Sequence, residues 1–443
     1  DFSVEVADPS WEPASFLPGR SANGLVALFH TGGTTGAPKL AQHTHANQLH
    51  SAWGAAQMYA MSSEDVVING FPMFHVAGAV VLGAFAPLNG AGVGFPTFLG
   101  TRDTSFVENY WRFVERHRVT LLAAVPTIIA SLNQVDRRET STRSVRALLT
   151  GGSPLPTELA NAFETKYGIP VRNILGMTEC AGVVSIEPFL ANRTSGSCGL
   201  PLPFTEVQAV AEDGMPCAPG ESGILRLRGP NVGPGYTDPL RNDGTFEDGW
   251  LITGDIGHVD AAGRVFVTGR AKDVIIRGAH NIDPQVIEEA LLQHPAVLMA
   301  AAVGEPDEYA GELPVAFVSL KPHATIDLDE LSAFANARIP ERPAYPKRIH
   351  VVEAIPVTAV GKVFKPRLRA LACERVLRER LSAAGVNNEV SVFVEDATRG
   401  LVARFRSKNG NATAQITQVE KIMGPFAVPY PFESDTVAAG VQL

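Results

Sequence analysis

Short apolar runs alternate with longer amphipathic stretches along the first 180 residues. The apolar runs predict buried strands at 25–29, 66–71, 121–125, 146–150 and 171–175. The amphipathic stretches predict helices at 43–61, 106–117 and 157–167. Strands that alternate with helices favour a mostly parallel sheet, whose ligands bind beyond the carboxyl ends of the strands. We expect the segments that follow 25–29, 146–150 and 171–175 to meet at that edge.

The pattern changes after residue 205. Short strands separated by Gly/Pro turns predict a β-rich subdomain over 205–260, and 263–276 predicts a hairpin that crosses into a second domain. Helices at 284–292 and 328–338, with strands at 297–303 and 314–320, predict that this second domain is small and α+β. Residues 367–384 predict a charged helix, and 385–443 alternate only weakly between apolar and polar positions.

Composition narrows the class of protein. The 443 residues are 45% apolar and 19% charged, which is typical of a globular protein with at least two domains. A net charge of −9 without a basic run argues against a nucleic-acid partner. The four cysteines show neither metal-ligand nor disulfide spacing, and no signal peptide opens the chain, so we expect a cytoplasmic protein.

Residues 70–101 contain no Asp, Glu, Lys or Arg but are interrupted by Pro72, Pro87 and Pro96. A buried helix, a turn and a buried strand explain this stretch better than a membrane span. We therefore expect no integral membrane segment.

The stretch LFHTGGTTGAPKL is the strongest candidate for a ligand site. Its glycines allow backbone N–H groups to converge on phosphate oxygens, its threonines add hydroxyl donors, and its lysine adds a positive charge. A Gly/Thr-rich surface turn is the alternative. The stretch is not the common nucleotide-binding P-loop, because Pro38 precedes the lysine and Leu40 follows it. The candidate phosphate-binding residues are Thr31, Gly32, Gly33, Thr34, Thr35, Gly36 and Lys39.

TGGTTGAPK resembles the phosphate loop of the adenylate-forming enzymes, which include acyl-CoA synthetases, peptide-synthetase adenylation domains and luciferases. GMTE, GWLITGD, GRAKDVI and VGKVFK resemble that family's later motifs, in the family's order, over residues 25–370. The resemblance implies an α/β fold with a large amino-terminal domain of mixed α/β sheets plus a small β-rich subdomain, and a smaller α+β lid domain. The boundaries expected are 1–269 and 270–384, with a hinge at 270–273 and an extension of unknown role at 385–443.

The family normally has a substantial stretch before its phosphate loop, and here 30 residues precede Thr31. We therefore expect part of the usual amino-terminal region to be absent from these residues. Its absence would leave sheet edges and apolar surface exposed.

The resemblance also implies roles in binding ATP and Mg²⁺. Glu179 would hold the Mg²⁺ that bridges the phosphates, and Thr178 would contact the α-phosphate. Taken alone, the pair fits the start of a helix better than a ligand site, and the other motifs reverse that judgement. Leu175 stands where the family usually has an aromatic residue against adenine. The other residues expected around the nucleotide are Gly151, Gly152, Ser153, Gly176, Met177, Asp255 for the ribose hydroxyls and Arg270 for ribose and phosphate.

Two lysines match positions that serve the chemistry. Lys272 matches the hinge position about which the lid rotates between half-reactions. Lys362 matches the catalytic lysine of adenylation, a compact cation that binds both the substrate carboxylate and the α-phosphate.

The acyl side of the site is expected around His75, Val76 and Gly78. Amino-acid-activating relatives carry an aspartate where His75 stands, which argues against an amino-acid substrate; a buried core histidine is an equal alternative. Gly278 and Ala279 match the wall of the pantetheine tunnel, where the family usually has glycine at position 279.

These features predict an acyl-CoA synthetase, an ATP-dependent acid–thiol ligase. It would convert a carboxylic acid into an acyl-adenylate and then into acyl-CoA. A fatty acid is the first choice of substrate and an aryl acid the second. One rival passes the acyl group to a carrier protein, and another is a non-catalytic nucleotide-binding relative or fragment. The sequence contains no feature from which the oligomeric state can be predicted.

Overall fold

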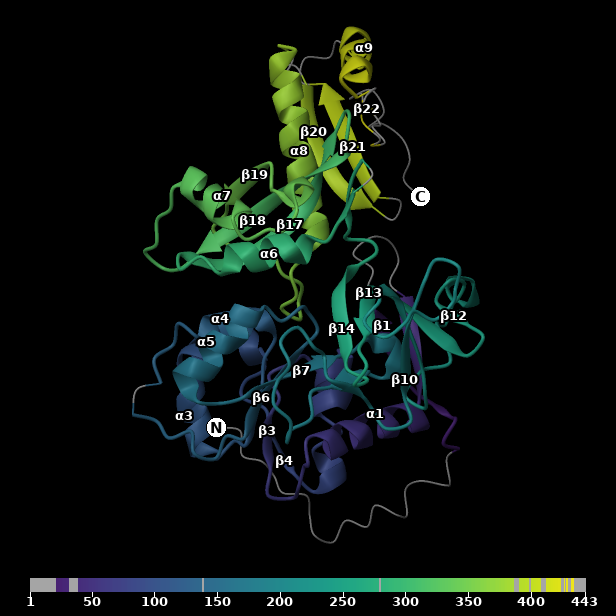
Figure 1. Cartoon of the computed structure of the whole chain (residues 1–443), viewed down its shortest axis with the longest axis vertical. Helices are drawn as coiled ribbons and strands as arrows, with labels where there is room; N and C mark the ends of the chain where they lie inside the picture. Colours follow the sequence, from purple (N-terminus) through teal and green to yellow (C-terminus); the bar gives the residue numbers. More distant parts are fainter. Residues whose placement is uncertain are drawn as a thin grey trace, which may run out of the picture.

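The computed structural model describes residues 21–31, 39–137, 139–278, 280–385, 390–397, 400–407, 412–423, 426, 428 and 432–433. Figure 1 shows three tiers. A large α/β body lies at the bottom, a smaller α+β unit lies above it, and a three-stranded sheet with one helix lies at the top. The chain therefore has the α/β architecture with a smaller second domain that the sequence predicts.

The large body is built on a seven-stranded sheet of order β4-β3-β5-β6-β7-β8-β9. Its first five strands in that order are parallel, and the last two are antiparallel. The strands are β3 (Val66–Ile68), β4 (Gly92–Gly94), β5 (Leu121–Ala123), β6 (Ala147–Gly151), β7 (Val171–Leu175), β8 (Ser185–Ile186) and β9 (Leu200–Pro201). The predicted mostly parallel sheet is confirmed.

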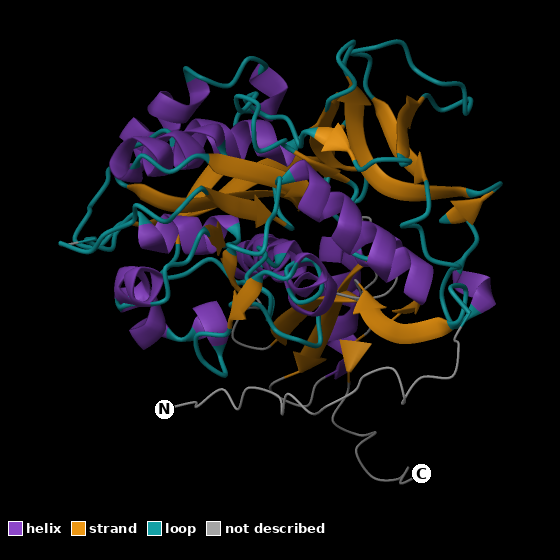
Figure 2. Cartoon of the chain, turned by 90° about the horizontal axis from the view of Figure 1, so that it is seen from below, coloured by secondary structure: helices purple, strands orange, loops and turns teal. Residues whose placement is uncertain are grey.

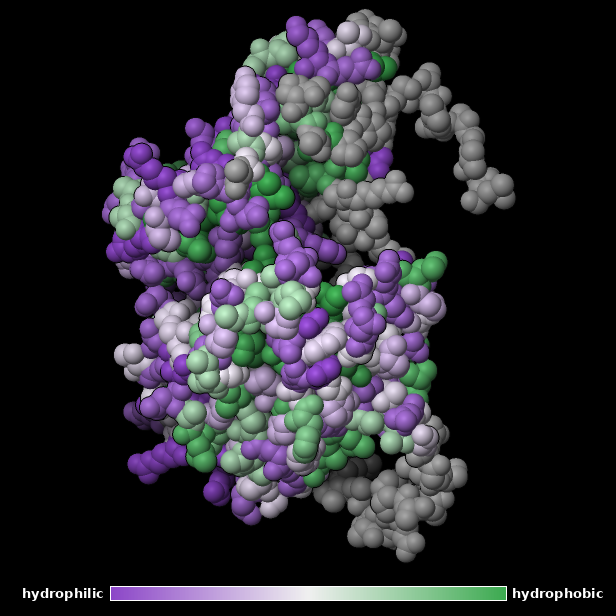
Figure 3. Space-filling model, turned by 45° about the vertical axis from the view of Figure 1, so that its right-hand side comes forward, coloured by the Kyte–Doolittle hydropathy of each residue, from purple (hydrophilic) through white to green (hydrophobic). Residues whose placement is uncertain are grey.

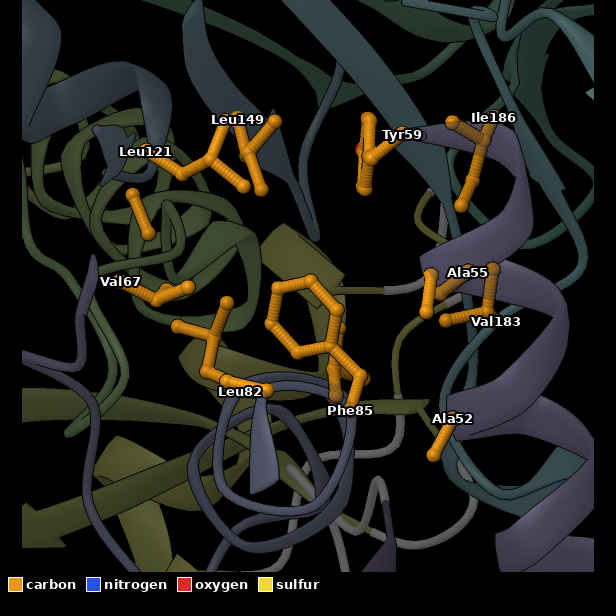
Figure 4. Close-up of a cluster of buried hydrophobic side chains, with 14 of the residues drawn as sticks. Ala52, Ala55, Tyr59, Val67, Leu82, Phe85, Leu121, Leu149, Val183 and Ile186 are labelled. Carbon is orange, nitrogen blue, oxygen red and sulfur yellow. The ribbon is translucent and has the colours of Figure 1, made fainter. Parts of the chain in front are cut away.

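Helices cover both faces of this sheet, as Figure 2 shows from below. They are α1 (His45–Met58), α2 (Thr104–Glu108), α3 (Tyr110–Arg116), α4 (Pro126–Leu132) and α5 (Thr157–Tyr167). Alternate strand residues face the two layers: Leu149 packs with α1, whereas Leu148 packs with α3 and α5. Figure 4 shows the first core, in which Tyr59 and Phe85 fill the space between α1 and the sheet.

The predicted helix at 106–117 is wrong in one respect, because it is two helices. Asn109 has φ −105° and ψ 13°, which ends α2 and begins α3. Its side-chain Nδ2 donates to the backbone oxygen of Ser105. Asparagine makes such local bonds readily and so competes with a continuous helix.

The strand before the phosphate loop does not join the parallel sheet. β1 (Leu25–Thr31) pairs antiparallel with β2 (Lys39–Thr44) in a separate two-stranded sheet. The expectation of a buried strand is wrong, since Leu25 and Leu28 are exposed and Phe29 alone in this strand is buried. An isolated two-stranded sheet leaves one face without a covering layer.

A second sheet forms the predicted β-rich subdomain. It contains β10 (Glu206–Val210), β11 (Gly223–Arg228), β12 (Phe246–Glu247), β13 (Trp250–Val259) and β14 (Val265–Arg270). The predicted hairpin at 263–276 is wrong, because β14 pairs with β13 in this sheet, whereas β15 (Ile275–Arg277) belongs to the next one. The chain does cross between the two sheets here, through the turn at 271–273.

The smaller unit is a five-stranded sheet covered by helices. Besides β15 it contains β16 (His280–Ile282), β17 (Val297–Asp307), β18 (Gly311–Leu320), β19 (Arg348–Val351), α6 (Pro284–Leu292), α7 (Leu328–Asn336) and α8 (Lys365–Ala383). On one face of the sheet, α6 and α7 pack over a core that includes Ile287 and Leu331. On the other face, α8 packs over β17 and β18.

The extension packs on the far side of α8. It consists of β20 (Val390–Ala397), β21 (Gly400–Ser407), α9 (Ala412–Met423) and β22 (Phe432–Glu433). Leu368 and Ala372 of α8 face the β17–β18 sheet, whereas Cys373 and Leu377 face Val392 and Phe405 of the extension. The charged helix predicted at 367–384 therefore carries two apolar faces, and two sheets share it as a common wall.

In the space-filling view of Figure 3, apolar residues are scattered over the lower body and hydrophilic residues dominate the upper left. The large exposed apolar side chains include Leu28, Trp53, Phe74 and Phe204. Among the helices that the structure describes, none combines the length and the apolarity needed to cross a bilayer.

Candidate functional site

A pocket opens where β5, β6 and β7 end, and it encloses about 680 Å³ with its open mouth included. One end is built from the glycine-rich turns after β6 and β7. The other end is walled by the π-helix Ala77–Leu82 and by apolar side chains. Its lining includes Phe71, His75, Val76, Val81, Leu82, Ala123, Val125, Leu149, Gly151, Gly152, Ile174, Gly176, Met177, Thr178, Val360 and Lys362.

Lys362 reaches this pocket from the smaller unit. The residue stands in a tight hairpin just before α8, where the Thr358 N–H donates to the Lys362 oxygen at 2.7 Å. Its side chain lies against Gly152, since a Cβ placed on that glycine would be 3.0 Å from Lys362 Cε. Gly152 also has φ +82°, so any other residue there would be strained and would displace the lysine.

The charges around Lys362 have both signs. Burial lowers the pKa of its ammonium, and the Arg270 guanidinium lowers it further, whereas the carboxylates of Asp255 and Glu179 raise it. Lys362 is therefore a buried cation whose lowered pKa shows that the nearby carboxylates do not fully offset its burial, and an anionic ligand in the pocket would relieve that cost.

Glu179 follows the turn after β7, in a short 3-10 helix at Thr178–Cys180. Oε1 of Glu179 accepts hydrogen bonds from the Thr31 hydroxyl at 2.9 Å and from the Tyr236 hydroxyl at 2.7 Å. Both contacts fall on the same oxygen. Oε2 accepts no hydrogen bond from the part of the chain that the structure describes.

This donor set fits a magnesium ion shared with phosphates. Mg²⁺ is usually held by one or two carboxylates together with phosphate oxygens and waters, and Oε2 of Glu179 is the oxygen that could serve it. Among the described residues there is no cluster of three or more His, Cys, Asp or Glu side chains that would hold a metal without such help.

Lys39 begins β2 and lies near Glu179. Its Nζ lies 4.6 Å from the centroid of the Tyr236 ring, a cation–π contact. Burial and the nearby charge of Lys272 lower the pKa of Lys39, whereas Glu179 raises it. Thus β1, β2, the turn after β7 and the loop between β11 and β12 bring two hydroxyls, a carboxylate and an ammonium group together.

Asp255 and Arg270 lie opposite each other on β13 and β14. Nε of Arg270 donates to Oδ1 of Asp255 at 2.8 Å, and the aspartate is buried whereas the arginine is exposed. Burial raises the pKa of Asp255, and Arg270 and Lys362 oppose that shift. The second carboxylate oxygen and the exposed guanidinium can bind a polar ligand such as a ribose or a phosphate.

His75 stands at the start of the π-helix and lines the apolar end. Its Nδ1 accepts a hydrogen bond of 3.1 Å from the Ala77 N–H, so the neutral ring carries its proton on Nε2. Burial lowers its pKa to about 4, with help from the positive charge of Lys362. At neutral pH it is therefore an uncharged donor rather than a buried cation.

The predicted site residues fall into four groups, the fourth of which does not line the pocket. His75, Val76, Gly151, Gly152, Gly176, Met177, Thr178 and Lys362 line the pocket. Thr31, Lys39, Glu179, Asp255, Arg270 and Lys272 surround these through the contacts and charges given above. Gly32, Gly33, Thr34, Thr35, Gly36 and Ala279 lie outside the described residues.

The fourth group consists of four predicted residues that neither line the pocket nor make the contacts given above. Gly78 is buried, and a Cβ there would lie 2.4 Å from the Pro72 oxygen, so this glycine allows the π-helix to pack closely. Ser153 and Leu175 flank the glycine-rich turns. Gly278 lies in an exposed turn with φ +58°.

Most of the apolar lining residues were not predicted from the sequence, and neither were two residues that make long-range hydrogen bonds at the site. Tyr236 lies 57 positions from the carboxylate to which it donates, and Thr127 lies 234 positions from its partner, the Gly361 oxygen. The only sequence signal for either residue was the proline or glycine that directly precedes it. Such positions are too common to mark a functional residue.

Comparison with known proteins gives the relatives of this fold and site. Residues 4–237 match the family described as AMP-binding enzyme, and residues 286–362 match the AMP-binding enzyme C-terminal domain. The chain is 37% identical over 409 residues to a marinolic acid–CoA ligase of Pseudoalteromonas sp. (strain SANK 73390). That match covers 88% of this chain but only 62% of the relative's length.

Two solved structures resemble the fold closely. The anthranilate CoA ligase AuaEII in complex with anthranoyl-AMP has a TM-score of 0.73 and 26% identity, over 82% of this chain and 69% of that one. The o-succinylbenzoate coenzyme A synthetase MenE of Bacillus subtilis, in complex with ATP and magnesium ion, has a TM-score of 0.67 and 31% identity. The second match covers 80% of this chain and 70% of that one.

Proposed function

Because the chain belongs to the AMP-binding enzyme family, we propose that it is an AMP-forming acid–CoA ligase. The observation that supports this most is the position of Lys362. A lysine of the smaller unit lies in a pocket of the large body, against Gly152 and beside the turn that carries Thr178 and Glu179. That arrangement suits a carboxylate meeting the α-phosphate of ATP.

In the first half-reaction, a carboxylate oxygen of the acid attacks the α-phosphorus of ATP. A C–O–P bond forms, the bond to the β-phosphate bridging oxygen breaks, and pyrophosphate leaves with that electron pair. Lys362 can bind both the attacking carboxylate and the α-phosphate, so its charge favours their approach and the charge that develops between them.

The remaining polar residues hold the nucleotide. In this proposal Thr31 and Lys39 would contact the phosphates, Asp255 would accept hydrogen bonds from the ribose hydroxyls, and Arg270 would contact ribose and phosphate. When Mg²⁺ is bound, it offsets phosphate charge, and Oε2 of Glu179 is the oxygen that would hold it.

In the second half-reaction, the sulfur of CoA attacks the acyl carbonyl carbon and AMP leaves. The thiol proton is lost to solvent as the thiolate attacks. Lys362 has no role in this step, and the lid would rotate about Lys272 to withdraw it. In this proposal the two domains span 1–269 and 270–384, and the extension spans 385–443. The proposed location is the cytoplasm.

The lining of the pocket favours an acid with an apolar body. Lys362 is the one charged side chain among the described residues that line it, and the far end is formed by Val81, Leu82, Ala123 and Leu149. A second carboxylate, a sulfonate or an ammonium group on the substrate would find no charged partner there. We therefore propose a fatty acid as the substrate, with an aryl acid as the second choice.

The test is pyrophosphate release by the full chain with ATP and Mg²⁺ across a panel of acids. Straight-chain fatty acids, benzoate-type acids, dicarboxylates and amino acids should separate the classes. We expect activity with fatty acids and none with amino acids. The proposal would be rejected if no acid supports pyrophosphate release, or if release is confined to acids that carry a second charged group.

The acceptor needs its own experiment, since the sequence places Ala279 where glycine is usual beside pantetheine. If CoA is the acceptor, Ala279→Gly should change single-turnover transfer from bound acyl-adenylate to CoA by less than about threefold. A rise of about tenfold or more would indicate an overpacked tunnel and favour a carrier protein as the natural acceptor.

A further inference from the structure

The hairpin that carries Lys362 is stiff. Besides the backbone bond from Thr358 N–H to the Lys362 oxygen, the Lys362 N–H donates to the Thr358 hydroxyl at 3.2 Å. Val357 and Val363 form a β-bridge below it. Gly361 at the tip has φ +78°, which turns the chain sharply just before the lysine. The position of the hairpin tip therefore fixes the position of the lysine stem.

The tip is seated on the large body at the start of α4. The Thr127 hydroxyl donates to the Gly361 oxygen at 3.0 Å. A Cβ on Gly361 would lie 2.9 Å from Val125 Cγ2 and 3.3 Å from Thr127 Oγ1, so the two segments are in close contact. Val360, on the other side of the tip, lines the pocket with Lys362.

Electrostatics oppose this placement when the pocket holds no anion. Burial and the charge of Arg270 both disfavour the ammonium of Lys362, as its lowered pKa indicates. The Thr127–Gly361 bond joins two uncharged groups, so it holds the hairpin in place whatever the pocket contains. It also joins two different domains, so it can form only while the hairpin is seated.

We propose that Thr127 is a positioning residue whose hydroxyl holds the Lys362 hairpin in the pocket and so favours acyl-adenylate formation over the thioester step. The effect of Thr127 on the two half-reactions rests on the proposed function. The contact itself can be tested without any substrate.

The test compares Thr127→Val, which keeps the shape and removes the hydroxyl, with Thr127→Ser, which keeps the hydroxyl. Thr127→Val should slow single-turnover acyl-adenylate formation about three- to tenfold, the effect expected from losing one neutral hydrogen bond. Transfer to CoA from supplied acyl-adenylate should be unchanged or faster. Thr127→Ser should behave like the unmodified chain in both steps.

A second readout needs no turnover. With an amine-reactive reagent and peptide mass analysis, the rate of modification of Lys362 in the full chain should rise in Thr127→Val by a factor similar to the loss of adenylation. Ser131→Ala is the matched control, because it removes an exposed hydroxyl from the same helix. Among the described residues that hydroxyl donates to the Thr127 backbone oxygen within α4 and makes no hydrogen bond with the hairpin. It should change neither the modification rate nor either half-reaction.

The outcomes separate the two ideas. If no acid supports pyrophosphate release but Lys362 modification still rises in Thr127→Val, the proposed function fails and the seating contact stands. The inference is overturned if modification of Lys362 is unchanged, if both half-reactions slow equally, or if Thr127→Ser behaves like Thr127→Val.

Discussion

The Tyr236 hydroxyl donates a 2.7 Å hydrogen bond to Oε1 of Glu179, the same oxygen that Thr31 contacts. Two hydroxyls on one oxygen fix the orientation of the carboxylate and turn its second oxygen toward other ligands. The same tyrosine ring lies under Nζ of Lys39. One residue of the β-rich subdomain thus orients the Glu179 carboxylate and supports the Lys39 ammonium group.

Glu179 should therefore determine the magnesium requirement. Glu179→Gln keeps the shape and the hydrogen bonds of one oxygen but removes the charge, so half-maximal pyrophosphate release should need about tenfold more Mg²⁺ or more. Glu206→Gln, which alters an exposed pair with Arg228, is the control and should leave the titration unchanged. An unaltered titration in Glu179→Gln would leave Glu179 as a structural residue of its turn.

Adenylation should depend on Lys362 far more than thioester formation does. Lys362→Ala removes the preorganised cation, and acyl-adenylate formation should fall by about 10²–10³. Transfer to CoA from acyl-adenylate supplied in solution should stay within about threefold of the original rate. Lys347→Ala changes an exposed lysine of the same domain and should affect neither step. Equal losses in the two steps would show that Lys362 does not have this role.

Ala123 should limit the length of the acyl group. It is buried at the end of β5 and lines the apolar end of the pocket, so Ala123→Leu would fill space that a long chain needs. Overpacking costs about 1–3 kcal/mol, so kcat/KM for a long-chain acid should fall about tenfold or more. A short-chain acid measured on the same variant is the internal control. A loss that is equal for all chain lengths would place Ala123 outside the acyl path.

Glu305 on β17 is a buried carboxylate that the proposed chemistry does not use. Burial raises its pKa to about 7, and its Oε2 has no hydrogen-bond partner among the described residues. An unfolded glutamate has a pKa near 4.3. Between those values the folded chain binds a proton that the unfolded chain lacks, so the free energy of unfolding decreases as pH rises through this window.

Glu305→Gln cannot ionise and should escape that loss. Its stability relative to the original chain should be about 1–3 kcal/mol greater near pH 8 than near pH 5, measured by urea unfolding. Glu341→Gln, at an exposed position of the same domain, should show no such pH dependence. A difference that is constant with pH would mean that Glu305 does not titrate as the structure indicates.

The sequence predicted some elements well because local signals agreed there. The helices α5 and α6 and the strand β7 have the bounds predicted for them, since each combines clear periodicity with proline or glycine at its ends. Asn109 broke the helix predicted at 106–117 because a short polar side chain competes for backbone bonds. The pairing of β1 with β2 depends on contacts outside the segment, which no local pattern encodes.

The same limit applies to the site. Motifs marked Thr178, Glu179, Asp255 and Lys362 because each belongs to a recognisable string. Tyr236 and Thr127 escaped notice because their partners are far along the chain, and only the folded structure brings those partners together. Long-range side-chain contacts of this kind have no periodicity to detect.

Because α8 packs against two sheets at once, the extension would move together with α8 in the lid rotation that we propose. Cys373 and Leu377 pack the extension against the helix that begins three residues after Lys362, and Figure 1 shows β20 and β21 beside that helix. A rotation that withdraws the lysine would therefore carry β20 and β21 with it. For a given rotation about the proposed hinge, the extension would be displaced farther than the hinge residues themselves. A fluorophore on the exposed side of β20, at Phe393, would report the direction of the lid in real time. Anything that binds the extension would in turn bias the timing of the two half-reactions.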